Sequence, residues 1–285
     1  MIEGDTFQRF LLDELHIRGE WVRLSDSFHE ATHDLNYPEN LRSLLGQATA
    51  ASVLLTGTLK FDGRLSIHAR GEGTVSLLMA EATNRRTYRG LVDWAGDVDT
   101  GASLVDLLGS AQLAITIDPD KGNRYQGVVP LEREHLADCL AHYFELSEQL
   151  DTFLMLESNE SGCFGLMLQK LPDYKTIEDQ DAWNRIVQFA KTLKIEEFME
   201  TDNETLMLRL FHEENVLSFD KEAVSFECSC SRERTLSSIE TLGEDEALEI
   251  LENSATIAVD CQFCRKHYEF DREDIVALFN LGASH

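Results

Sequence analysis

The chain has 285 residues, 43% of them hydrophobic and 27% charged, a composition that excludes a fully disordered or fibrous protein and allows a sizeable core. The 52 acidic and 25 basic residues give a formal net charge of −27, which disfavours binding to nucleic acids and anionic membranes. Neither a membrane-spanning run of apolar residues nor a secretory signal is seen in the sequence. We therefore expect a cytoplasmic protein that binds neither nucleic acid nor membrane.

Residues 1–174 are predicted to form a mixed domain of the α+β class, because helical and strand-like segments do not alternate regularly along them. Apolar residues at helical spacing predict one helix over 38–55 and a second over 132–149. Short apolar segments, several of them bounded by turn residues, predict seven strands: 65–69, 74–79, 87–92, 112–117, 125–129, 153–156 and 164–169.

Residues 175–220 are predicted to form a helical linker with an acidic stretch at 196–204. Its two helices carry an apolar face made of Trp183, Ile186, Val187, Leu193, Leu206, Leu210 and Phe211. Ordinary packing between domains would explain this face. A detachable cover over the first domain would also explain it, but such a cover needs a trigger elsewhere in the chain.

Residues 221–285 are predicted to form a small C-terminal module. A helical stretch over 231–253, a strand over 256–260 and a terminal helix over 271–280 are expected. A core of about 65 residues barely suffices for stability by itself, so a metal or another cross-link is expected in this module.

Four of the six cysteines lie in this module, as a Cys-x-Cys pair and a Cys-x-x-Cys pair separated by 231–260. Four thiolates satisfy the tetrahedral preference of Zn²⁺, and we predict one zinc ion per chain on Cys228, Cys230, Cys261 and Cys264. Free thiols or an iron–sulfur cluster are the weaker alternatives. A closed four-thiolate site leaves no open coordination position for catalysis by zinc, so the site is expected to be structural, regulatory or both.

Thiolates that bind zinc are deprotonated and are therefore open to attack by peroxide or hypochlorite. Zinc binding contributes about 10–16 kcal/mol to the folding of such modules. A disulfide within either cysteine pair closes a very small loop and returns little of this free energy. Oxidation within the pairs should therefore unfold the module, and we expect a marginally stable neighbour to follow.

Several segments resemble one known family. They are VSFECSCSRER at 224–234, CQFC at 261–264, RYQGVV at 124–129, SEQL at 147–150 and GLMLQ at 165–169. The chain is similar over essentially its whole length to the bacterial redox-regulated holdase family known as the 33 kDa chaperonin. One departure is Asp151, where the family pattern leads us to expect proline.

The resemblance implies an ATP-independent, stress-responsive chaperone that is inactive while it is reduced and zinc-bound. It also implies that oxidation forms two local disulfides, Cys228 with Cys230 and Cys261 with Cys264. Zinc is then released, the zinc domain and the helical linker unfold, and the exposed surface binds unfolding client proteins and prevents their aggregation. A homodimer, favoured on oxidation, is a further expectation from the family.

Two other functions remain open at this point. A zinc-ribbon interaction protein that binds nucleic acid would need basic residues around the metal, yet 221–285 is rich in acidic residues. A thiol–disulfide oxidoreductase would place Cys261 and Cys264 at the start of a helix and would leave the first cysteine pair without a role.

Other patterns carry less weight. His29 and His33 match the His-Glu-x-x-His motif of zinc proteases, but Pro38 follows closely and no third ligand is near in sequence, so no protease is predicted. Cys139 and Cys163 are predicted to be packed thiols without a role.

Overall fold

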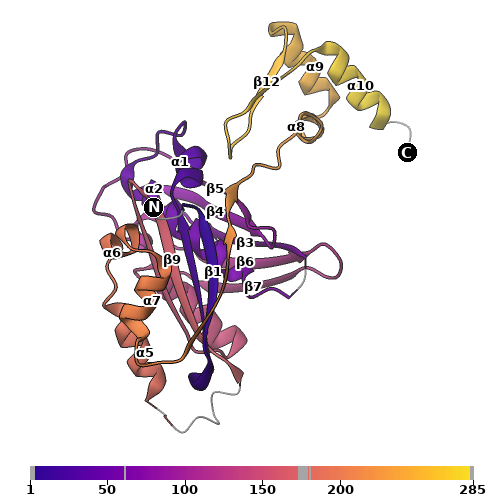
Figure 1. Ribbon diagram of the computed structural model, residues 1–285. Coiled ribbons are helices and arrows are strands. Elements are labelled where there is room, and N and C mark those ends of the chain that lie inside the picture. The colour runs from indigo at the N-terminus through magenta and orange to yellow at the C-terminus, as the bar shows by residue number, and fades with distance from the viewer. Residues whose placement is uncertain (1–3, 61, 173–178, 180, 283–285) are drawn as a thin grey trace. The chain divides into compact units, whose positions relative to one another are not determined.

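The computed structural model describes residues 4–60, 62–172, 179 and 181–282. The chain divides into two compact units, Met1–Glu227 and Cys228–His285 (Figure 1). Helices and antiparallel sheets occur in separate runs along the chain, which confirms the α+β class. Within the described ranges, every helix is too short or too polar to cross a membrane.

The first unit contains a five-stranded antiparallel sheet with the order β10-β1-β2-β9-β8. Its strands are β1 (Thr6–Leu12), β2 (Ile17–Leu24), β8 (Thr152–Asn159), β9 (Gly162–Lys170) and β10 (Val216–Ala223). Thr6 pairs with Ala223 in this sheet, so the beginning and the end of the unit's sequence lie side by side. A short 3₁₀ turn, η1 (Asp13–Leu15), joins β1 to β2.

A six-stranded sheet with the order β11-β5-β4-β3-β6-β7 completes the sheets of this unit. Its strands are β3 (Gly63–Arg70), β4 (Val75–Thr83), β5 (Thr87–Trp94), β6 (Gln112–Pro119), β7 (Tyr125–Pro130) and the two-residue β11 (Ser225–Phe226). The pairing is antiparallel except between β11 and β5.

The long helix α2 (Glu39–Thr56) lies between the two sheets and builds the main core of the unit. It is rich in alanine and leucine, and 13 of its 18 residues are buried. Gly46 permits the close approach, since a Cβ there would collide with Ser158 and press on Cys163. Three shorter helices and one π-helical turn surround this core: α1 (Asp26–Thr32), α3 (Leu104–Leu108), α4 (Leu136–Tyr143) and η2 (Phe144–Glu148).

Three helices of the predicted linker cover the opposite face of the five-stranded sheet (Figure 1). They are α5 (Ala182–Lys191), α6 (Ile195–Glu200) and α7 (Asn203–Phe211). Side chains alternate along a strand, so Val22 and Leu24 of β2 face α2, while Ile17 and Trp21 face the linker helices. Both faces of this sheet are therefore covered.

The second unit contains the hairpin β12 (Ile257–Asp260) and β13 (His267–Phe270). Around it lie α8 (Arg232–Ile239), α9 (Glu244–Asn253) and α10 (Arg272–Gly282). Its core is small, with seven buried apolar residues: Ile239, Ala247, Ile257, Tyr268, Phe270, Ile275 and Leu278.

All seven predicted strands correspond to β3–β9, and the helix predicted over 38–55 corresponds to α2. The helix predicted over 132–149 is shorter, because it begins at Leu136 and continues as the π-helical η2. The stretch over 231–253 is two helices, separated near Gly243, whose φ of 87° does not fit a right-handed helix. The sequence did not predict β1, β2, α1, α3, α6, β10, β11 and β13, and 216–220 of the predicted helical linker belong to the strand β10.

The predicted division at 220/221 lies inside β10, because 221–223 continue to pair with β1. The compact units divide instead between Glu227 and Cys228. Residues 175–178 and 180 of the predicted linker lie outside the described ranges.

Candidate metal centre

The four cysteines of the second unit come together from two segments. Cys228 and Cys230 lie just before α8, and Cys261 and Cys264 lie in the turn between β12 and β13. Their four Sγ atoms lie within 4.8 Å of one another. The Sγ atoms are 3.6 Å apart for Cys228 and Cys261, and 3.5 Å apart for Cys230 and Cys264. A zinc tetrahedron with bonds of about 2.3 Å has sulfur–sulfur edges of about 3.8 Å, so the cluster fits this ion.

Backbone geometry brings the second pair together. The Cys261 amide donates to the Lys266 carbonyl at 3.0 Å, and the Arg265 amide donates to the Cys261 carbonyl at 2.8 Å. Arg265 has a left-handed φ of 55°, which turns the chain back into β13. The resulting tight turn brings the thiols of Cys261 and Cys264 to the same cluster.

The first pair is fixed by the start of α8. Ser231 caps this helix, because its hydroxyl accepts a hydrogen bond from the Arg234 amide at 3.2 Å. The Arg234 guanidinium donates in turn to the Ser229 carbonyl at 2.8 Å. The Cys-x-Cys segment is therefore held in place by the side chain of Arg234, which α8 positions.

The electrostatics of the cluster favour a cation. Burial raises the pKa of the Cys228 and Cys264 thiols. For Cys230 burial also acts to raise the pKa, but hydrogen bonds from the Tyr268 hydroxyl and from the neighbouring thiols outweigh it, and the pKa falls to about 7. One thiolate forms readily in this cluster, whereas four adjacent thiolates require a divalent cation to offset their repulsion. One Zn²⁺ meets this requirement.

His267 does not join the cluster. It lies in β13, with Nδ1 at 2.7 Å from the Asp260 carboxylate and Nε2 at 3.2 Å from the Glu269 carboxylate. These two carboxylates raise the pKa of the imidazole. Both ring nitrogens therefore have acidic partners, in agreement with the expectation that the four thiolates suffice as ligands.

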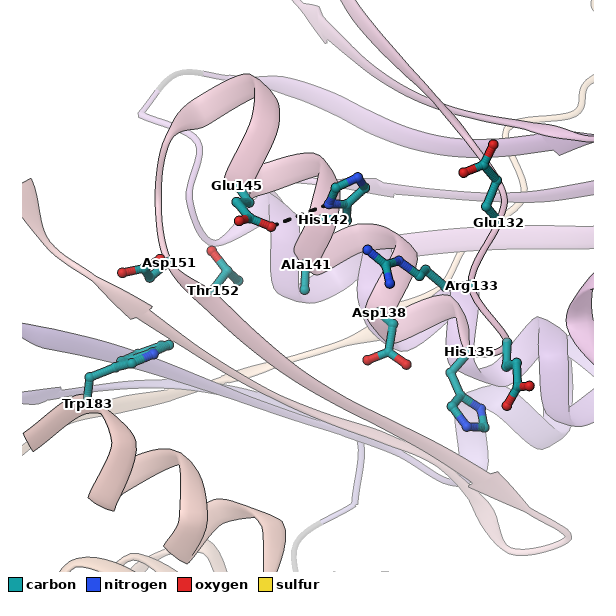
Figure 2. A pocket seen from close by; sticks show the side chains of 11 residues that line it. Glu132, Arg133, His135, Asp138, Ala141, His142, Glu145, Asp151, Thr152 and Trp183 are labelled. Atoms are coloured by element: carbon teal, nitrogen blue, oxygen red, sulfur yellow. Dashed lines mark hydrogen bonds and ion pairs between the residues drawn. The ribbon is translucent and has the colours of Figure 1, made fainter. Parts of the chain in front are cut away.

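A surface cavity in the first unit, with a volume of about 650 Å³, lies between α4, the start of β8 and Trp183 of α5 (Figure 2). Acidic side chains and two histidines line most of it, and His142 Nδ1 lies 3.4 Å from the Glu145 carboxylate. Among the residues that the structure describes, no cysteine or serine lines this cavity. In the part of the chain that the structure describes, the four-cysteine cluster is the one group of three or more potential metal ligands.

The remaining motifs have structural explanations. The rings of His29 and His33 stack at 6.1 Å near the end of α1, with no further ligand gathered around them in the described residues. Cys139 and Cys163 are buried in the core of the first unit, and burial raises the pKa of both thiols. Both residues lie in the first compact unit, whereas the four-cysteine cluster lies in the second.

Of the seven residues of the predicted linker face, six pack in or against the apolar cluster on the five-stranded sheet. Ile186, Leu193, Leu206, Leu210 and Phe211 are buried in one apolar cluster with side chains of β1, β2 and β9. Trp183 is partly buried against the same cluster, whereas Val187 is half-buried and outside it.

Sequence reasoning missed Phe198, which is 1% exposed and lies at the centre of the contact. Its ring centroid lies 5.1 Å from those of Trp21 and Phe164. Acidic residues surround Phe198 in the sequence, and the spacing of Ile195 and Phe198 was the signal that could have found it.

A polar group under the linker was also missed. Arg23, Gln8 and Asn203 are each at most 5% exposed. The Asn203 amide donates to Gln8 at 3.0 Å, and the Arg23 guanidinium donates to the Thr201 carbonyl at 2.7 Å. These contacts attach the corner between α6 and α7 to the sheet.

A family model described as Hsp33 protein matches residues 5–271. The 33 kDa chaperonin of Hahella chejuensis is 48% identical over 288 residues and covers 100% of both chains. The chain belongs to the Hsp33 family. The 33 kDa chaperonin of Ectopseudomonas mendocina is 44% identical over 97% of this chain and 95% of the relative. The crystal structure of the Thermotoga maritima 33 kDa chaperonin shares the fold, with a TM-score of 0.86 over 99% of this chain and 100% of that one at 21% identity.

Membership in the Hsp33 family makes this chain a redox-regulated holdase chaperone for unfolding client proteins, without enzymatic activity. The four-cysteine cluster supplies the site for its zinc ion. Cys261 and Cys264 lie in a turn between two strands and not at a helix start, which argues against a thioredoxin-like oxidoreductase.

Proposed function

We propose that this chain is a three-part redox switch, in which residues 1–174 are the chaperone core, 175–220 the releasable linker and 221–285 the sensor. The observation that carries the proposal is the apolar cover of α5–α7 on the five-stranded sheet, in a chain whose next unit contains four clustered thiols. Because β10 continues the linker into the sheet, the releasable segment extends beyond the 175–220 range and ends at Ala223.

The proposed ligands in the reduced state are Cys228, Cys230, Cys261 and Cys264. Bound zinc would offset the mutual repulsion of the four thiolates and would cross-link the two segments that carry them. Tyr268 and the capped start of α8 hold the sulfurs in place, and the small core of the second unit is the reason that it depends on this cross-link.

Oxidation is proposed to join Cys228 to Cys230 and Cys261 to Cys264. Each pair of thiolates gives two electrons to the oxidant and forms one S–S bond; with hydrogen peroxide and two protons, two water molecules result. Loop closure favours these short separations once the module has loosened. The competing bridges are Cys228 with Cys261 and Cys230 with Cys264, whose sulfurs lie close in the folded cluster.

Peptide mapping of the oxidised protein tests this pairing. We expect mainly the two local bridges, and a majority of bridges between the two segments would contradict the assignment. The Cys139→Ser and Cys163→Ser variants are matched controls, because both thiols are buried in the first unit and should leave the pattern unchanged.

Loss of the folded sensor is proposed to remove one of the two anchors of the linker. Its helices have 10, 6 and 9 residues, and helices this short depend on packing for most of their stability. Their departure would expose Phe10, Trp21, Phe164, Leu166 and Leu168 on the sheet together with the apolar faces of the helices. This apolar surface is the proposed binding site for unfolding clients.

Two further properties belong to the proposal. We place the protein in the cytoplasm, where a reducing environment keeps the thiols available for zinc. We also propose a homodimer that is favoured on oxidation, because the exposed apolar surface of one chain is available to a second copy. Sedimentation of the reduced and oxidised protein tests the dimer.

The central experiment measures aggregation of a thermally unfolding client in the presence of reduced or peroxide-treated protein, with zinc release followed in parallel. Suppression of aggregation should appear only after zinc is released. Equal suppression by the reduced, zinc-loaded protein would overturn the proposed switch.

A further inference from the structure

Arg86 connects the body of the first unit to the linker strand β10. Its side chain is 8% exposed and all of its guanidinium nitrogens have partners. Nε and Nη2 donate to the Glu222 carboxylate of β10 at 2.9 and 3.2 Å, and Nη1 donates to the Thr56 hydroxyl at 3.2 Å. The guanidinium also stacks 3.7 Å above the Phe7 ring. Through this ion pair with two hydrogen bonds, β10 is joined to the six-stranded part of the unit.

A second carboxyl group, that of Glu20, lies beside the Phe7 ring and has no arginine partner of this kind. Glu20 of β2 is 2% exposed, and its Oε2 atom is buried with no hydrogen-bond partner among the residues that the structure describes. A Cβ on Gly57 would meet both the Phe7 ring and this Oε2, so Glu20 borders the ring on which Arg86 stacks. Glu20 and Arg86 therefore approach the same end of α2.

The guanidinium group of Arg9 is a second cation near Glu20, and it also lies beside the Glu222 carboxylate. Arg9 of β1 lies directly opposite Glu20 in the strand register, yet its Nη2 atom is 3.6 Å from the Glu222 carboxylate. The charged groups that act on Glu20 are thus Arg18 on its own strand, Arg9, Arg86 and the Glu222 carboxylate. With β10 in place, Glu222 takes up the guanidinium groups of Arg9 and Arg86.

We propose that Arg86, Glu222 and Glu20 form a carboxylate-exchange latch, in which Arg86 binds Glu222 while β10 is in the sheet and binds Glu20 after β10 has left. In the closed state the Glu20 carboxyl keeps its proton. When β10 leaves, Glu222 moves into solvent as a carboxylate, the Glu20 proton passes to water, and the Glu20 carboxylate pairs with Arg86 and Arg9. One proton is released and no electrons move.

The latch predicts a dependence of linker release on pH. Burial raises the pKa of Glu20 from 4.5 to about 7 in the closed state, against the opposing effect of Arg18, Arg86 and Arg9. The closed state therefore holds a proton that the open state has lost, and its stability falls as the pH rises from the open-state pKa to about 7. Release of β10 becomes up to about tenfold more favourable per pH unit in this window.

The exchange also gives Arg86 a role in keeping the linker open. After release, Arg86 has a carboxylate partner within the body of the unit, so β10 must break this new pair before it can return. Arg86 and Glu222 are positioning residues for the linker, and Glu20 is the group that changes its charge.

This inference rests on the proposed release of the linker, and the test separates the two. Hydrogen exchange of the β10 amides is measured in the reduced, zinc-bound protein at several pH values between 5.5 and 7.5 and is corrected for intrinsic exchange rates. In the native chain, the opening constant of β10 should rise about five- to tenfold from pH 5.5 to 6.5. In Glu20→Gln this rise should be absent, because the amide cannot lose a proton.

Two further variants sharpen the result. Glu222→Gln should raise β10 opening and also remove the pH dependence, because Arg86 is then free to pair with Glu20 in the closed state. Asp220→Asn alters a neighbouring exposed carboxylate on β10 and should leave the pH dependence unchanged. An equal pH dependence in the native chain and in Glu20→Gln would overturn the latch.

Infrared difference spectroscopy gives a measurement that does not depend on the variants folding. Oxidation of the native chain at pH 6 should remove the carbonyl band of one protonated carboxylic acid, and no loss of such a band would also overturn the latch. If β10 keeps its protection after oxidation, the proposed release of the linker fails. If β10 loses protection but the pH dependence survives in Glu20→Gln, the latch alone fails.

Discussion

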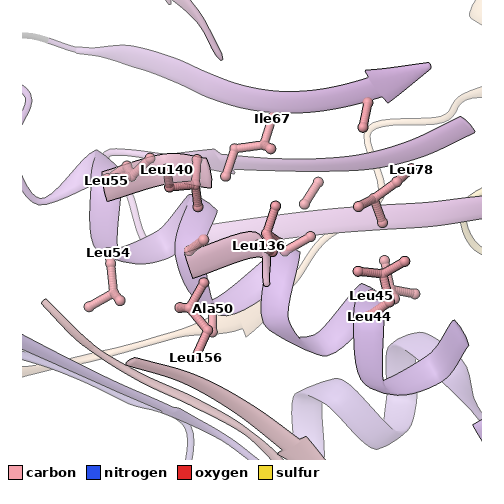
Figure 3. Packing of buried hydrophobic residues seen from close by; sticks show 14 of the residues in the cluster. Leu44, Leu45, Ala50, Leu54, Leu55, Ile67, Leu78, Leu136, Leu140 and Leu156 are labelled. Atoms are coloured by element: carbon pink, nitrogen blue, oxygen red, sulfur yellow. The ribbon is translucent and has the colours of Figure 1, made fainter. Parts of the chain in front are cut away.

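The two faces of the five-stranded sheet are both apolar, but they are covered in different ways. On one face, α2 is enclosed by a second sheet, and leucines of α2 such as Leu54 and Leu55 pack among residues of the strands and of α4 (Figure 3). On the other face, α5, α6 and α7 cover the sheet from one side only. The comparison separates a core that is enclosed between two sheets from a cover that, under the proposed switch, can leave the sheet.

Polar groups add to the difference between the faces. Under the linker, Arg23 is 4% exposed and makes no ion pair with a carboxylate within 4.0 Å among the described residues, and burial lowers the pKa of its guanidinium. A buried charge without a carboxylate partner weakens the contact that contains it. On the α2 side, Ser52 and Thr56 satisfy their hydroxyls within the helix itself. The linker contact therefore holds a buried guanidinium whose partner is the Thr201 carbonyl and not a carboxylate, whereas on the α2 side the buried group without a hydrogen-bond partner among the described residues is the Oε2 atom of Glu20.

Removal of the metal should have the largest effect and should open one face only. In Cys261→Ser, zinc affinity should fall strongly, and the second unit should lose much of the roughly 10–16 kcal/mol that zinc contributes to such modules. Hydrogen exchange should rise throughout Cys228–His285 and in α5–α7, while β3, β4 and α2 stay protected. Metal analysis together with hydrogen exchange measures both outcomes.

The matched control is Cys163→Ser, which changes a thiol far from the metal ligands in sequence and buried in the other unit. It should retain one zinc ion per chain. Full zinc affinity in Cys261→Ser would count against the ligand assignment, and equal loss of protection on both sheet faces would end the distinction between core and cover.

An aspartate placed in the linker contact and one placed in the α2 contact should give opposite phenotypes. Ile186 and Leu54 are both fully buried, and an aspartate at either position should cost more than about 5 kcal/mol through lost packing and a buried charge. Ile186→Asp should release the linker and suppress client aggregation without oxidant. Leu54→Asp should unfold the first unit and yield no chaperone.

Gln188→Asp, at an exposed position of the same helix as Ile186, is the control and should behave like the native chain. If Ile186→Asp has a disrupted linker but still needs peroxide to suppress aggregation, linker release is not the switch.

The metal site could be predicted from the sequence because its ligands form two local motifs whose spacing is itself the signal. The central helix and the strands β3–β9 were also predicted, since each has a regular apolar pattern. The strand β2 was not, because it is covered on both faces and carries Glu20 and Arg23 at buried positions, which breaks the alternation.

Contacts between distant residues could not be predicted in this way. Arg86 and Glu222 are 136 positions apart, and neither belongs to a motif. β10 likewise has no strong apolar pattern, and its place in the sheet follows from pairing with β1. The sequence thus predicted the gathering of the four cysteines, but only the tertiary structure reveals how the linker segment is held.

Truncation of the central aromatic contact of the cover should have a smaller effect than a buried charge. Phe198→Ala removes a ring that stacks on Phe164 and packs at a tilt against Trp21, and it should weaken linker docking by about 3–5 kcal/mol. The amount of peroxide needed for activity should fall, as an aggregation assay over a series of oxidant concentrations would measure.

Leu208→Ala is the control for this change, because Leu208 is 68% exposed on α7 and should have little effect. An unchanged oxidant requirement in Phe198→Ala would show that α6 does not contribute to holding the cover.

The smallest effect is expected at the N-terminus of α7. Asp202 caps this helix by accepting hydrogen bonds from the Thr205 amide at 2.9 Å and from its hydroxyl at 2.8 Å. These bonds lower the pKa of Asp202, so the cap is present at neutral pH and is lost as the pH falls through this lowered value. Asp202→Ala should weaken the cover by about 1 kcal/mol and raise linker opening about fivefold.

Asp202→Asn separates capping from charge, because the amide oxygen still accepts the Thr205 bonds while the negative charge near Arg23 is lost. If capping accounts for the effect, the asparagine variant should open like the native chain and the alanine variant should not. If both open equally, the negative charge beside the buried Arg23 is the important feature, and neutralising it weakens the hold of the corner between α6 and α7 on the sheet. Hydrogen exchange of the α7 amides at neutral pH distinguishes these outcomes, and an unchanged opening constant in Asp202→Ala would show that α7 opens without depending on its cap.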